Sequence, residues 1–335
     1  MRAYELHPED GFASLTMVDR PAPAATLGDH DVRVRVRAVS LNFRDLNIAR
    51  AAKKRAKRVV PVSDGAGEVI AVGAQVTCVA PGDRVAAAFF PTWIDGGFRE
   101  EHHAKALGGS IDGMLAEEVV LPAAAWVKLS PHLSFEQAAT LPCAGVTAYN
   151  ALFEAVTLRP GAVVLVQGTG GVSMLALQLA RAAGATVIAT SKTAAKAERA
   201  RALGAAAVID YAANPAWGKI AYDLAGGGVD LVIEVGGPQT FEQSVAATRI
   251  DGAIGLVGIL TGERGEIDLS PIRRKSIHVL GITVGSARTL AALDRAIARW
   301  ALQPVIDRVF AFDEAAHAFD HLASGAQFGK VVIRV

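Results

Sequence analysis

The chain has 335 residues, of which 51% are hydrophobic and 20% are charged, and its formal net charge at pH 7 is +1. This composition is typical of a folded globular protein, the length favours two domains, and the near-neutral charge argues against nucleic acid or an anionic membrane surface as a partner. The two cysteines, Cys78 and Cys143, do not indicate a disulfide framework. No apolar run reaches the ~18 residues of a membrane span, and the first residues are too polar for a secretory signal, so we expect a cytoplasmic protein.

The first third of the chain contains several short strand patterns. Residues Asp31 to Ser40 alternate small apolar residues with arginine, which predicts a half-buried strand whose arginines face solvent. Further strands are expected at Val69 to Val72, Asp83 to Ala87 and Val119 to Pro122, with Gly and Pro turns between them. Short strands without regular helices predict a small barrel-like β domain.

Two polar segments in this region have alternative interpretations. The basic run Lys53 to Arg58 is either a solvated loop or a site that captures an acidic substrate tail. The Gly-rich segment 91–118 holds His102 and His103 beside two glutamates. Because neighbouring side chains on an extended chain point in opposite directions, we expect a solvated loop there and no metal site.

The segment Val163 to Ser173 has the features of a dinucleotide cradle. An apolar strand runs into a Gly-rich turn, and a helix pattern follows. Glycines there let a phosphate approach main-chain N–H groups at a helix N-terminus. The spacing matches GxGxxG with Ser173 in the last place, whereas an ordinary Gly-rich turn is the alternative. The predicted cradle consists of Gly168, Thr169, Gly170, Gly171 and Val172.

Beyond the cradle, strand and helix patterns alternate, which predicts a parallel, doubly wound α/β sheet. A helix is expected at Val146 to Val156 and another at Ala194 to Leu203. Strands are expected at Thr186 to Thr190, Ala207 to Tyr211, Val229 to Val235, Ala253 to Leu260 and Ile277 to Val284. Ligands of such sheets bind at the carboxyl edge of the strands. That edge supplies the further candidate cofactor contacts Thr190, Ser191, Lys192, Tyr211, Val235, Gly236, Gly258, Ile259, Leu260, Val284, Gly285 and Ser286.

The residues after the second strand of this sheet indicate which cofactor is used. NAD enzymes place a carboxylate about 20 residues past the Gly-rich turn to bind the ribose hydroxyls. Here Thr190, Ser191 and Lys192 stand in that place, and Lys196 follows. Without a carboxylate to repel a 2′-phosphate, NADPH is the expected cofactor. The alternative is that both lysines are simply exposed on the next helix.

Six motifs together resemble the medium-chain dehydrogenase/reductase superfamily, in the branch of quinone oxidoreductases and zinc-independent alcohol dehydrogenases. They lie at Leu41 to Asp45, Asp64 to Gly67, Pro81 to Val85, Leu141 to Cys143, Gly168 to Val172 and Gly329 to Val332. The resemblance covers almost the whole chain. It implies a GroES-like catalytic domain at 1–125 and 288–335, and a Rossmann NADP(H)-binding domain at 126–287. An active-site cleft between the two domains, cofactor contacts at Phe328 and Lys330, and a homodimer or homotetramer are implied as well.

The zinc ligands of the metal-dependent members are mostly missing. The region around Asn42 has no Cys, Ser63-Asp64 replaces a His-Glu pair, and of the ligand positions only Cys143 carries a soft donor. The segment 91–118 takes the place of the four-Cys zinc lobe. One soft ligand cannot hold zinc in a tetrahedral catalytic site, so we expect no metal.

Without a metal, hydrogen-bond donors must stabilise the charge that develops on the acceptor's oxygen. The positions that match the family's cleft nominate Asn42, Arg44, Asp45 and Thr147; alternatively, Asn42 and Asp45 only hold a loop. Activated alkenes need the least electrophilic help. We therefore expect an NADPH-dependent oxidoreductase that reduces a quinone or enone. A zinc-independent alcohol dehydrogenase or carbonyl reductase, and a protein that binds NADPH without turnover, are the alternatives.

Overall fold

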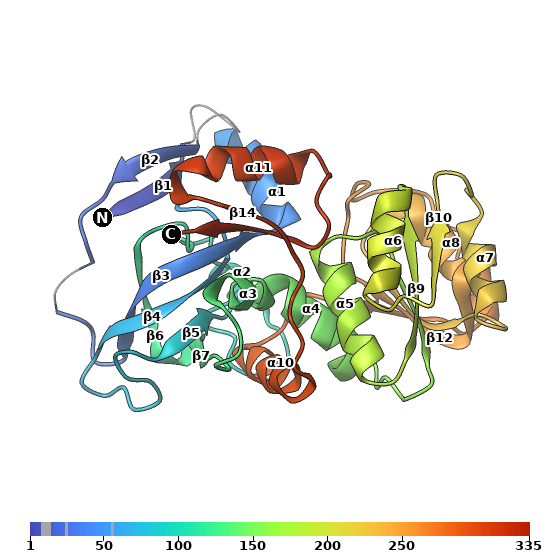
Figure 1. Ribbon diagram of the computed structural model, residues 1–335, viewed down its shortest axis with the longest axis horizontal. Helices are drawn as coiled ribbons and strands as arrows, with labels where there is room; N and C mark the ends of the chain where they lie inside the picture. The colour runs from blue at the N-terminus through green and yellow to red at the C-terminus, as the bar shows by residue number, and fades with distance from the viewer. Residues whose placement is uncertain (8–14, 24–25, 55–56) are drawn as a thin grey trace. The chain divides into compact units, whose positions relative to one another are not determined.

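The computed structural model describes residues 1–7, 15–23, 26–54 and 57–335 (Figure 1). The chain forms two compact units, Met1–Val146 with Val284–Val335, and Thr147–Thr283. Residues 126–146, which we assigned to the nucleotide-binding domain, pack in the first unit. They do so because β7 (Trp126–Lys128) pairs with β5 (Arg84–Ala87) at the end of the first unit's sheet.

The first unit is built on a mixed sheet with the strand order β14-β15-β3-β4-β5-β7, and β6 also pairs with β3. In β3 (Asp31–Leu41), Val32, Val34 and Val36 are at most 1% exposed, as the alternating pattern predicts. The remaining strands of the unit are β1 (Arg2–Leu6), β2 (Leu15–Asp19), β4 (Asp64–Val72), β6 (Glu118–Pro122), β14 (Ile306–Phe310) and β15 (Lys330–Arg334). Its helices are α1 (Phe43–Arg50), α2 (Glu100–His103), α3 (Phe135–Ala138), α10 (Ala287–Trp300) and α11 (Ala315–Ala323).

The end of the chain completes this first unit. Strand β15 lies between β14 and β3, parallel to the former and antiparallel to the latter. Figure 1 shows α11, in red, beside α1, in blue, and the two helices are in contact. Apolar residues from both ends of the chain, such as Leu6, Leu46 and Phe319, share one buried core.

The second unit is a parallel six-stranded sheet in the order β10-β9-β8-β11-β12-β13. This is the Rossmann order. The chain starts in the middle of the sheet at β8, adds β9 and β10 on one side, and then adds β11, β12 and β13 on the other side. The strands are β8 (Val163–Val166), β9 (Thr186–Ser191), β10 (Ala207–Asp210), β11 (Val229–Glu234), β12 (Thr248–Leu256) and β13 (His278–Gly281). The helices are α4 (Val146–Tyr149, at the unit boundary), α5 (Gly171–Ala182), α6 (Ala194–Ala202), α7 (Trp217–Leu224), α8 (Pro238–Ala247) and α9 (Ser270–Arg274).

Three predicted elements of this part differ in the structure. Strand β12 begins at Thr248 and ends at Leu256, so residues 258–260 follow the strand. Strand β13 ends at Gly281 because its partner β12 ends there, where Leu256 pairs with Gly281. The helix predicted at Val146 to Val156 is only four residues of α-helix, which continue into wider π-helical turns at Asn150–Glu154.

The segment 91–118 is more buried than a solvated loop. Trp93 is 6% exposed and joins a core cluster with Phe89 and Phe90. His102 lies in α2, is 2% exposed, and its ring stacks on Trp93 at a centroid distance of 6.0 Å. The predicted solvation is therefore wrong for His102, because aromatic residues scattered among the polar ones supply a small core.

Two further predictions concern solvent and membrane. In the basic run, Arg55 and Ala56 lie outside the described residues, and the side chains of Lys57 and Arg58 are exposed. Among the helices that the structure describes, none is long and apolar enough to cross a membrane.

Candidate functional site

The Gly-rich turn opens the second unit's sheet at the point where the strand order reverses. Gly168 has a φ of +64°, a conformation that favours glycine. A Cβ placed on Gly168 or Gly170 would meet no atom within 4 Å, so space is open above the turn. The 12-residue helix α5 starts at Gly171 with unpaired N–H groups at its N-terminus. This arrangement fits the pyrophosphate of a dinucleotide.

The end of β9 lies next to this turn. The Gly168 N–H donates to Thr190 Oγ1 at 3.0 Å, and Thr190 is buried. The Ser191 hydroxyl, also buried, donates to the Thr193 carbonyl at 3.2 Å. Thr190 thus accepts and Ser191 donates a hydrogen bond within the protein, whereas Lys192 is exposed and Lys196 half-buried. No carboxylate occurs between residues 190 and 196.

Tyr211 follows the neighbouring strand β10. Its backbone N–H donates to the Ser191 carbonyl at 3.2 Å, and the residue is 39% exposed. The ring therefore belongs to the same sheet edge as the segment 190–192. An exposed aromatic face at this edge suits stacking on a flat heterocycle.

The turns after β11 and β12 approach each other closely. A Cβ on Gly258 would lie 2.3 Å from the Val235 carbonyl oxygen, so a larger residue would push the two turns apart. Gly236 is equally constrained, with Thr240 Oγ1 at 2.2 Å from its ideal Cβ position. Ile259 and Leu260 are both nearly half exposed. These predicted contacts share the carboxyl edge with the Gly-rich turn, as in dinucleotide-binding sheets.

Four other predicted cofactor contacts belong to the first unit. Val284 has a φ of +46°, and Gly285 is buried beside it. The Ser286 hydroxyl caps α10 by accepting the Thr289 N–H at 3.2 Å. Phe328 is 1% exposed, so its ring offers no open face to a cofactor. The ring packs in the core, and the predicted cofactor contact of Phe328 stays a prediction.

Lys330 was expected at the cofactor, but its ammonium group lies in a buried polar network of the first unit. It donates to the Leu41 carbonyl at 2.7 Å and to Asn42 Oδ1 at 2.5 Å. Its side chain is 3% exposed, and Nζ lies 3.9 Å from Asp64 Oδ2. The two hydrogen bonds of this ammonium thus point into the network, whereas its assignment to the cofactor stays a prediction.

Asp64 is the fully buried acid of this network. It accepts the Ser63 hydroxyl at 2.8 Å and the Cys143 backbone N–H at 3.0 Å. Asn42 Nδ2 donates in turn to Ser63 Oγ at 3.4 Å. Burial raises the pKa of Asp64, whereas the nearby Lys330 ammonium opposes that rise.

Asp45 and Arg44 act locally in the structure. Asp45 is 0% exposed, and its Oδ2 accepts the Asn42 N–H at 2.8 Å at the start of α1. Burial raises the pKa of Asp45 to about 6, opposed by Arg44. The Arg44 guanidinium donates to the Leu107 carbonyl at 2.8 Å and lies 4.5 Å from the Phe89 ring centroid. Asp45 is therefore not accessible to a substrate that would accept a hydride. Its contacts agree with the alternative interpretation, in which it holds the loop at the start of α1.

Thr147 and Cys143 both lie where the helical backbone is irregular. Thr147 is buried in α4, at the start of the second unit. Cys143 is half-buried in the π-helical turns Leu141–Gly145. Burial, together with the negative charge of Asp64, raises the pKa of the Cys143 thiol. A thiol in this state is a poor nucleophile at neutral pH.

The residues of this network do not fit a zinc ion. Within residues 1–7, 15–23, 26–54 and 57–335, no three His, Cys, Asp or Glu side chains gather as metal ligands. Both oxygens of Asp64 already accept hydrogen bonds, and a lysine ammonium lies 3.9 Å away. A zinc ion would need at least three ligands in a tetrahedral arrangement and would be repelled by that ammonium.

Sequence reasoning missed several polar residues that shape these two regions. Ser63 and Asp64 entered only as replacements for zinc ligands, and Lys330 entered only as a cofactor contact. Gln167 and Glu234 are buried at the cofactor edge and were not singled out. A glutamate directly after the apolar run Leu231 to Ile233, at the end of a strand, was the available signal.

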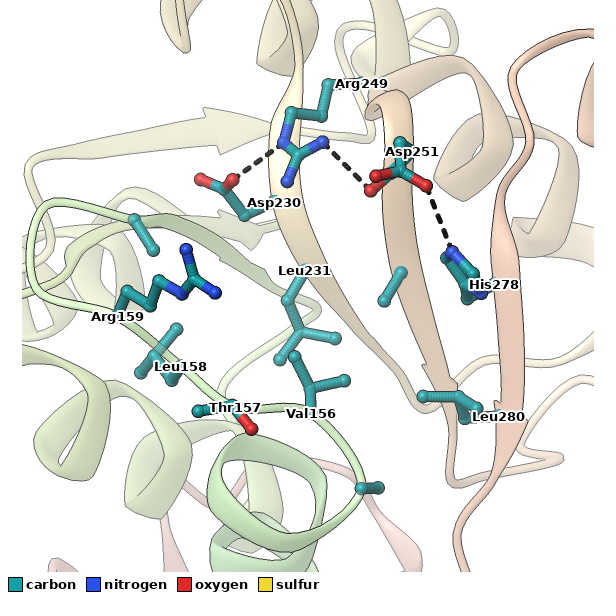
Figure 2. A pocket seen from close by; sticks show the side chains of 13 residues that line it. Val156, Thr157, Leu158, Arg159, Asp230, Leu231, Arg249, Asp251, His278 and Leu280 are labelled. Atoms are coloured by element: carbon teal, nitrogen blue, oxygen red, sulfur yellow. Dashed lines mark hydrogen bonds and ion pairs between the residues drawn. The ribbon is translucent and has the colours of Figure 1, made fainter.

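A hollow of about 450 Å³ lies at the opposite, amino edge of the second unit's sheet (Figure 2). Figure 2 shows Asp230, Arg249, Asp251 and His278 along its rim; Arg249 Nε donates to Asp230 at 2.7 Å. None of the predicted cofactor contacts lines it. Its position at the amino ends of the strands separates it from the Gly-rich turn.

Two protein-family models match the chain. Residues 28–131 match an alcohol dehydrogenase GroES-like domain, and residues 171–299 match a zinc-binding dehydrogenase. A zinc-type alcohol dehydrogenase-like protein, C1773.06c of Schizosaccharomyces pombe, is 40% identical, with 99% of each chain covered. A quinone oxidoreductase of Pseudomonas aeruginosa is 32% identical, with 91% of each chain covered.

Solved structures give the same picture. A putative alcohol dehydrogenase from Sinorhizobium meliloti 1021 is 42% identical with a TM-score of 0.92, covering 99% of this chain and 98% of the other. An NAD-dependent alcohol dehydrogenase is 33% identical with a TM-score of 0.90 over all of both chains. Mycobacterial Rv1454c, solved with NADPH, is 27% identical with a TM-score of 0.83 over all of both chains.

Proposed function

Because the chain belongs to the medium-chain dehydrogenase/reductase superfamily and is an oxidoreductase of that family, we propose that it is an NADPH-dependent reductase of quinones or enones that works without zinc. The observation that carries this proposal is the buried network of Lys330, Asn42 and Asp64. It stands where the metal-dependent members of the family are expected to keep their ligands. The Lys330 ammonium is fixed there by two hydrogen bonds and would repel a metal cation at this place.

Because the residues of the network do not fit a zinc ion, we expect substrates that can themselves stabilise the negative charge brought by the hydride. In a quinone or enone the arriving negative charge is delocalised onto the carbonyl oxygen, so hydrogen bonds suffice to stabilise it. A simple ketone lacks this help. The P. aeruginosa relative named a quinone oxidoreductase supports this substrate class.

Support for NADPH comes from the end of β9. When bound, NADPH supplies the hydride. Gly168 and Gly170 would leave room for its pyrophosphate, and the exposed Lys192 would face its 2′-phosphate. No acid stands at residues 190–196 to repel that phosphate. The NADPH complex of Rv1454c agrees with this preference, whereas the relative named NAD-dependent marks the competing outcome.

The residues that we propose lie near the hydride acceptor hold one another in place by hydrogen bonds. Lys330 and Ser63 fix the two ends of the Asn42 amide, through Oδ1 and Nδ2 respectively. Asp64 fixes the backbone at Cys143. A polar group that is held in advance stabilises developing charge without reorganising during the reaction.

The deciding experiment measures NADPH oxidation with a quinone, an enone and an aldehyde, and identifies the enone product. A saturated ketone supports the proposal. An allylic alcohol supports the second candidate, a zinc-independent carbonyl reductase or alcohol dehydrogenase, which is favoured by the names of two close relatives. Tight NADPH binding with no acceptor-dependent oxidation would identify a binding protein instead.

A variant pair tests the acceptor side. Asn42→Ala should lower kcat/KM for the acceptor by roughly 10- to 100-fold, since one positioned polar group is lost, with NADPH affinity unchanged. Asn47→Ala, on the exposed face of the same helix α1, is the matched control and should leave both quantities unchanged. Equal activity of the two variants would return Asn42 to a purely structural role.

Zinc content tests the metal-free part of the proposal. Elemental analysis of the purified protein should find zinc well below one equivalent, and chelation should leave activity intact. Stoichiometric zinc, with activity lost on chelation and restored by the metal, would overturn the zinc-free mechanism.

A further inference from the structure

Glu234 is a completely buried carboxylate at the carboxyl end of β11, with 0% exposure. Five donors surround it. Oε1 accepts the backbone N–H groups of Gly236 and Gly237 at 2.7 and 2.9 Å, and the Thr240 hydroxyl at 2.7 Å. Oε2 accepts Gln167 Nε2 at 2.6 Å and the hydroxyl of Ser244. All five donors are neutral groups, so the carboxylate is held by hydrogen bonds.

These bonds join three turns of the cofactor edge. Gln167 immediately precedes the Gly-rich turn, and its Oε1 accepts the N–H groups of Val235 and Gly236 at 3.2 Å. The backbone carbonyl of Glu234 accepts the N–H groups of Val257 and Gly258 at 2.8 and 3.1 Å. Glu234 therefore contacts the turns after β8, β11 and β12.

We propose that Glu234 is a positioning residue for cofactor binding, whose carboxylate holds the turns after β8 and β11 in the spacing that the dinucleotide requires. This inference rests on the proposed function, because it assumes that the carboxyl edge binds NADPH. Glu234 itself does not touch the cofactor. It acts through Gln167 and through the backbone of residues 235–237.

The direction of the hydrogen bonds makes the proposal specific. An ionised carboxylate only accepts, whereas an amide has one accepting and one donating end. In Glu234→Gln, the amide oxygen Oε1 can still accept the hydrogen bonds that Gly236, Gly237 and Thr240 donate. The new NH2 group then faces the NH2 group of Gln167, and two donors oppose each other. Turning the Gln167 amide over does not help, because its NH2 group would then face the N–H groups of Val235 and Gly236.

A second substitution should remove this conflict. In the double variant Gln167→Glu with Glu234→Gln, the amide at 234 donates to the carboxylate at 167. That carboxylate still accepts the N–H groups of Val235 and Gly236. Ser244 can rotate so that its hydroxyl accepts from residue 234 and donates to residue 167. The double variant thus satisfies every donor that the single variant leaves opposed.

The test measures the dissociation constant of NADPH by fluorescence titration, together with kcat, KM and the melting temperature. Glu234→Gln should raise the Kd about tenfold or more, because a buried donor left without an acceptor displaces the turns. At saturating cofactor, kcat should stay within about threefold of the wild type. The double variant should recover most of the lost affinity.

Asp230→Asn provides the matched control on the same strand. Asp230 lies at the amino end of β11, where it accepts the Val163 N–H at 2.7 Å and Arg249 Nε at 2.7 Å (Figure 2). Its replacement should lower the melting temperature without changing the Kd for NADPH. Thr240→Val, which removes one donor and keeps the carboxylate, should give a smaller rise in Kd and serves if Glu234→Gln does not fold.

The outcomes separate this inference from the proposed function. A wild-type protein that binds neither NADPH nor NADH refutes the proposed cofactor. A wild type that binds NADPH, with a Glu234→Gln variant that melts earlier but binds equally well, refutes the positioning role. Failure of the double variant to recover affinity, with Thr240→Val also unchanged, overturns it as well.

Discussion

Asp64 accepts the backbone N–H of Cys143 at 3.0 Å, across 79 residues of sequence. The bond ties the first residue of β4 to the π-helical turns Leu141–Gly145. It also places a buried acid against the backbone of a cysteine whose thiol stays protonated. The two motifs that share this bond are the ones in which a metal-dependent relative is expected to carry zinc ligands. Here they are joined directly to each other.

The reactivity of the two cysteines should differ sharply. Cys78 is exposed, whereas burial and the charge of Asp64 raise the pKa of Cys143. Since the thiolate is the nucleophile, iodoacetamide at pH 8 should label Cys78 at least about tenfold faster than Cys143. Mass spectrometry of Cys78→Ser and Cys143→Ser proteins assigns the label. Rapid labelling of the Cys78→Ser protein would contradict the burial of the second thiol.

Asp45 should give the protein a pH-dependent stability of a definite sign. Its pKa is raised from 3.8 to about 6, so its contribution is fully present below pH 4 and is lost as the pH rises through about 6. A shift of this size corresponds to about 3 kcal/mol in the free energy of unfolding. Asp45→Asn should therefore gain stability relative to the wild type between pH 4.5 and pH 7.5, measured by urea unfolding.

An opposite control is available in Asp83. Lys128 donates to this carboxyl and lowers its pKa, so its contribution is present at neutral pH and is lost on acidification. Asp83→Asn should thus lose stability relative to the wild type at neutral pH and match it in acid. If both variants showed the same trend, the buried state of Asp45 would be in doubt.

The cofactor preference should respond to a charge at the end of β9. Ser191→Asp introduces a carboxylate where a 2′-phosphate is expected and where NAD enzymes bind the ribose hydroxyls. We expect kcat/KM for NADPH to fall by about 10-fold or more and that for NADH to hold or rise. Lys192→Ala should weaken the binding of NADPH and leave the binding of NADH unchanged. Lys219→Ala, an exposed lysine on α7 paired with Asp223, is the neutral control. A wild type that prefers NADH would refute the argument.

We also propose that the chain forms a homodimer or homotetramer through β13. This strand is the edge of the second unit's sheet, and Val279 on it is 40% exposed. An apolar edge strand invites pairing with its copy. Val279→Lys should shift the mass measured by light scattering at micromolar concentration toward the monomer. Leu224→Lys, at an exposed site on α7, should leave it unchanged. A monomeric wild type would end this proposal.

Much of the fold could be predicted because its signals are local. The alternation in β3 and the strand–turn–helix pattern at Gly168 each occupy fewer than about 20 residues, and their periods identify them directly. The alternation of strands and helices then predicts a parallel, doubly wound sheet. The ends of β12 and β13 were less predictable, because they depend on where the neighbouring strand stops.

The candidate site was harder to predict because its contacts are distant in sequence. Lys330 and Asn42 are 288 residues apart, and no local pattern indicates that the lysine points inward from β15. Burial of a lysine is also contrary to its ordinary preference, so nothing in the sequence indicated that Lys330 joins a buried network. Glu234 was missed as well: four of its five donors lie within ten residues of it, but Gln167, which links it to the Gly-rich turn, is 67 residues away.

The place of Lys330 in the chain also constrains how the protein is made. The segment 147–283 is continuous and can fold as soon as it has left the ribosome. The first unit is interrupted by it, and β3 gains its neighbour β15 only after the segment 147–283 has been synthesised. Until then Asp64 lacks its ammonium neighbour. The network of Lys330, Asn42 and Asp64 can therefore be assembled only after the whole second unit has been made.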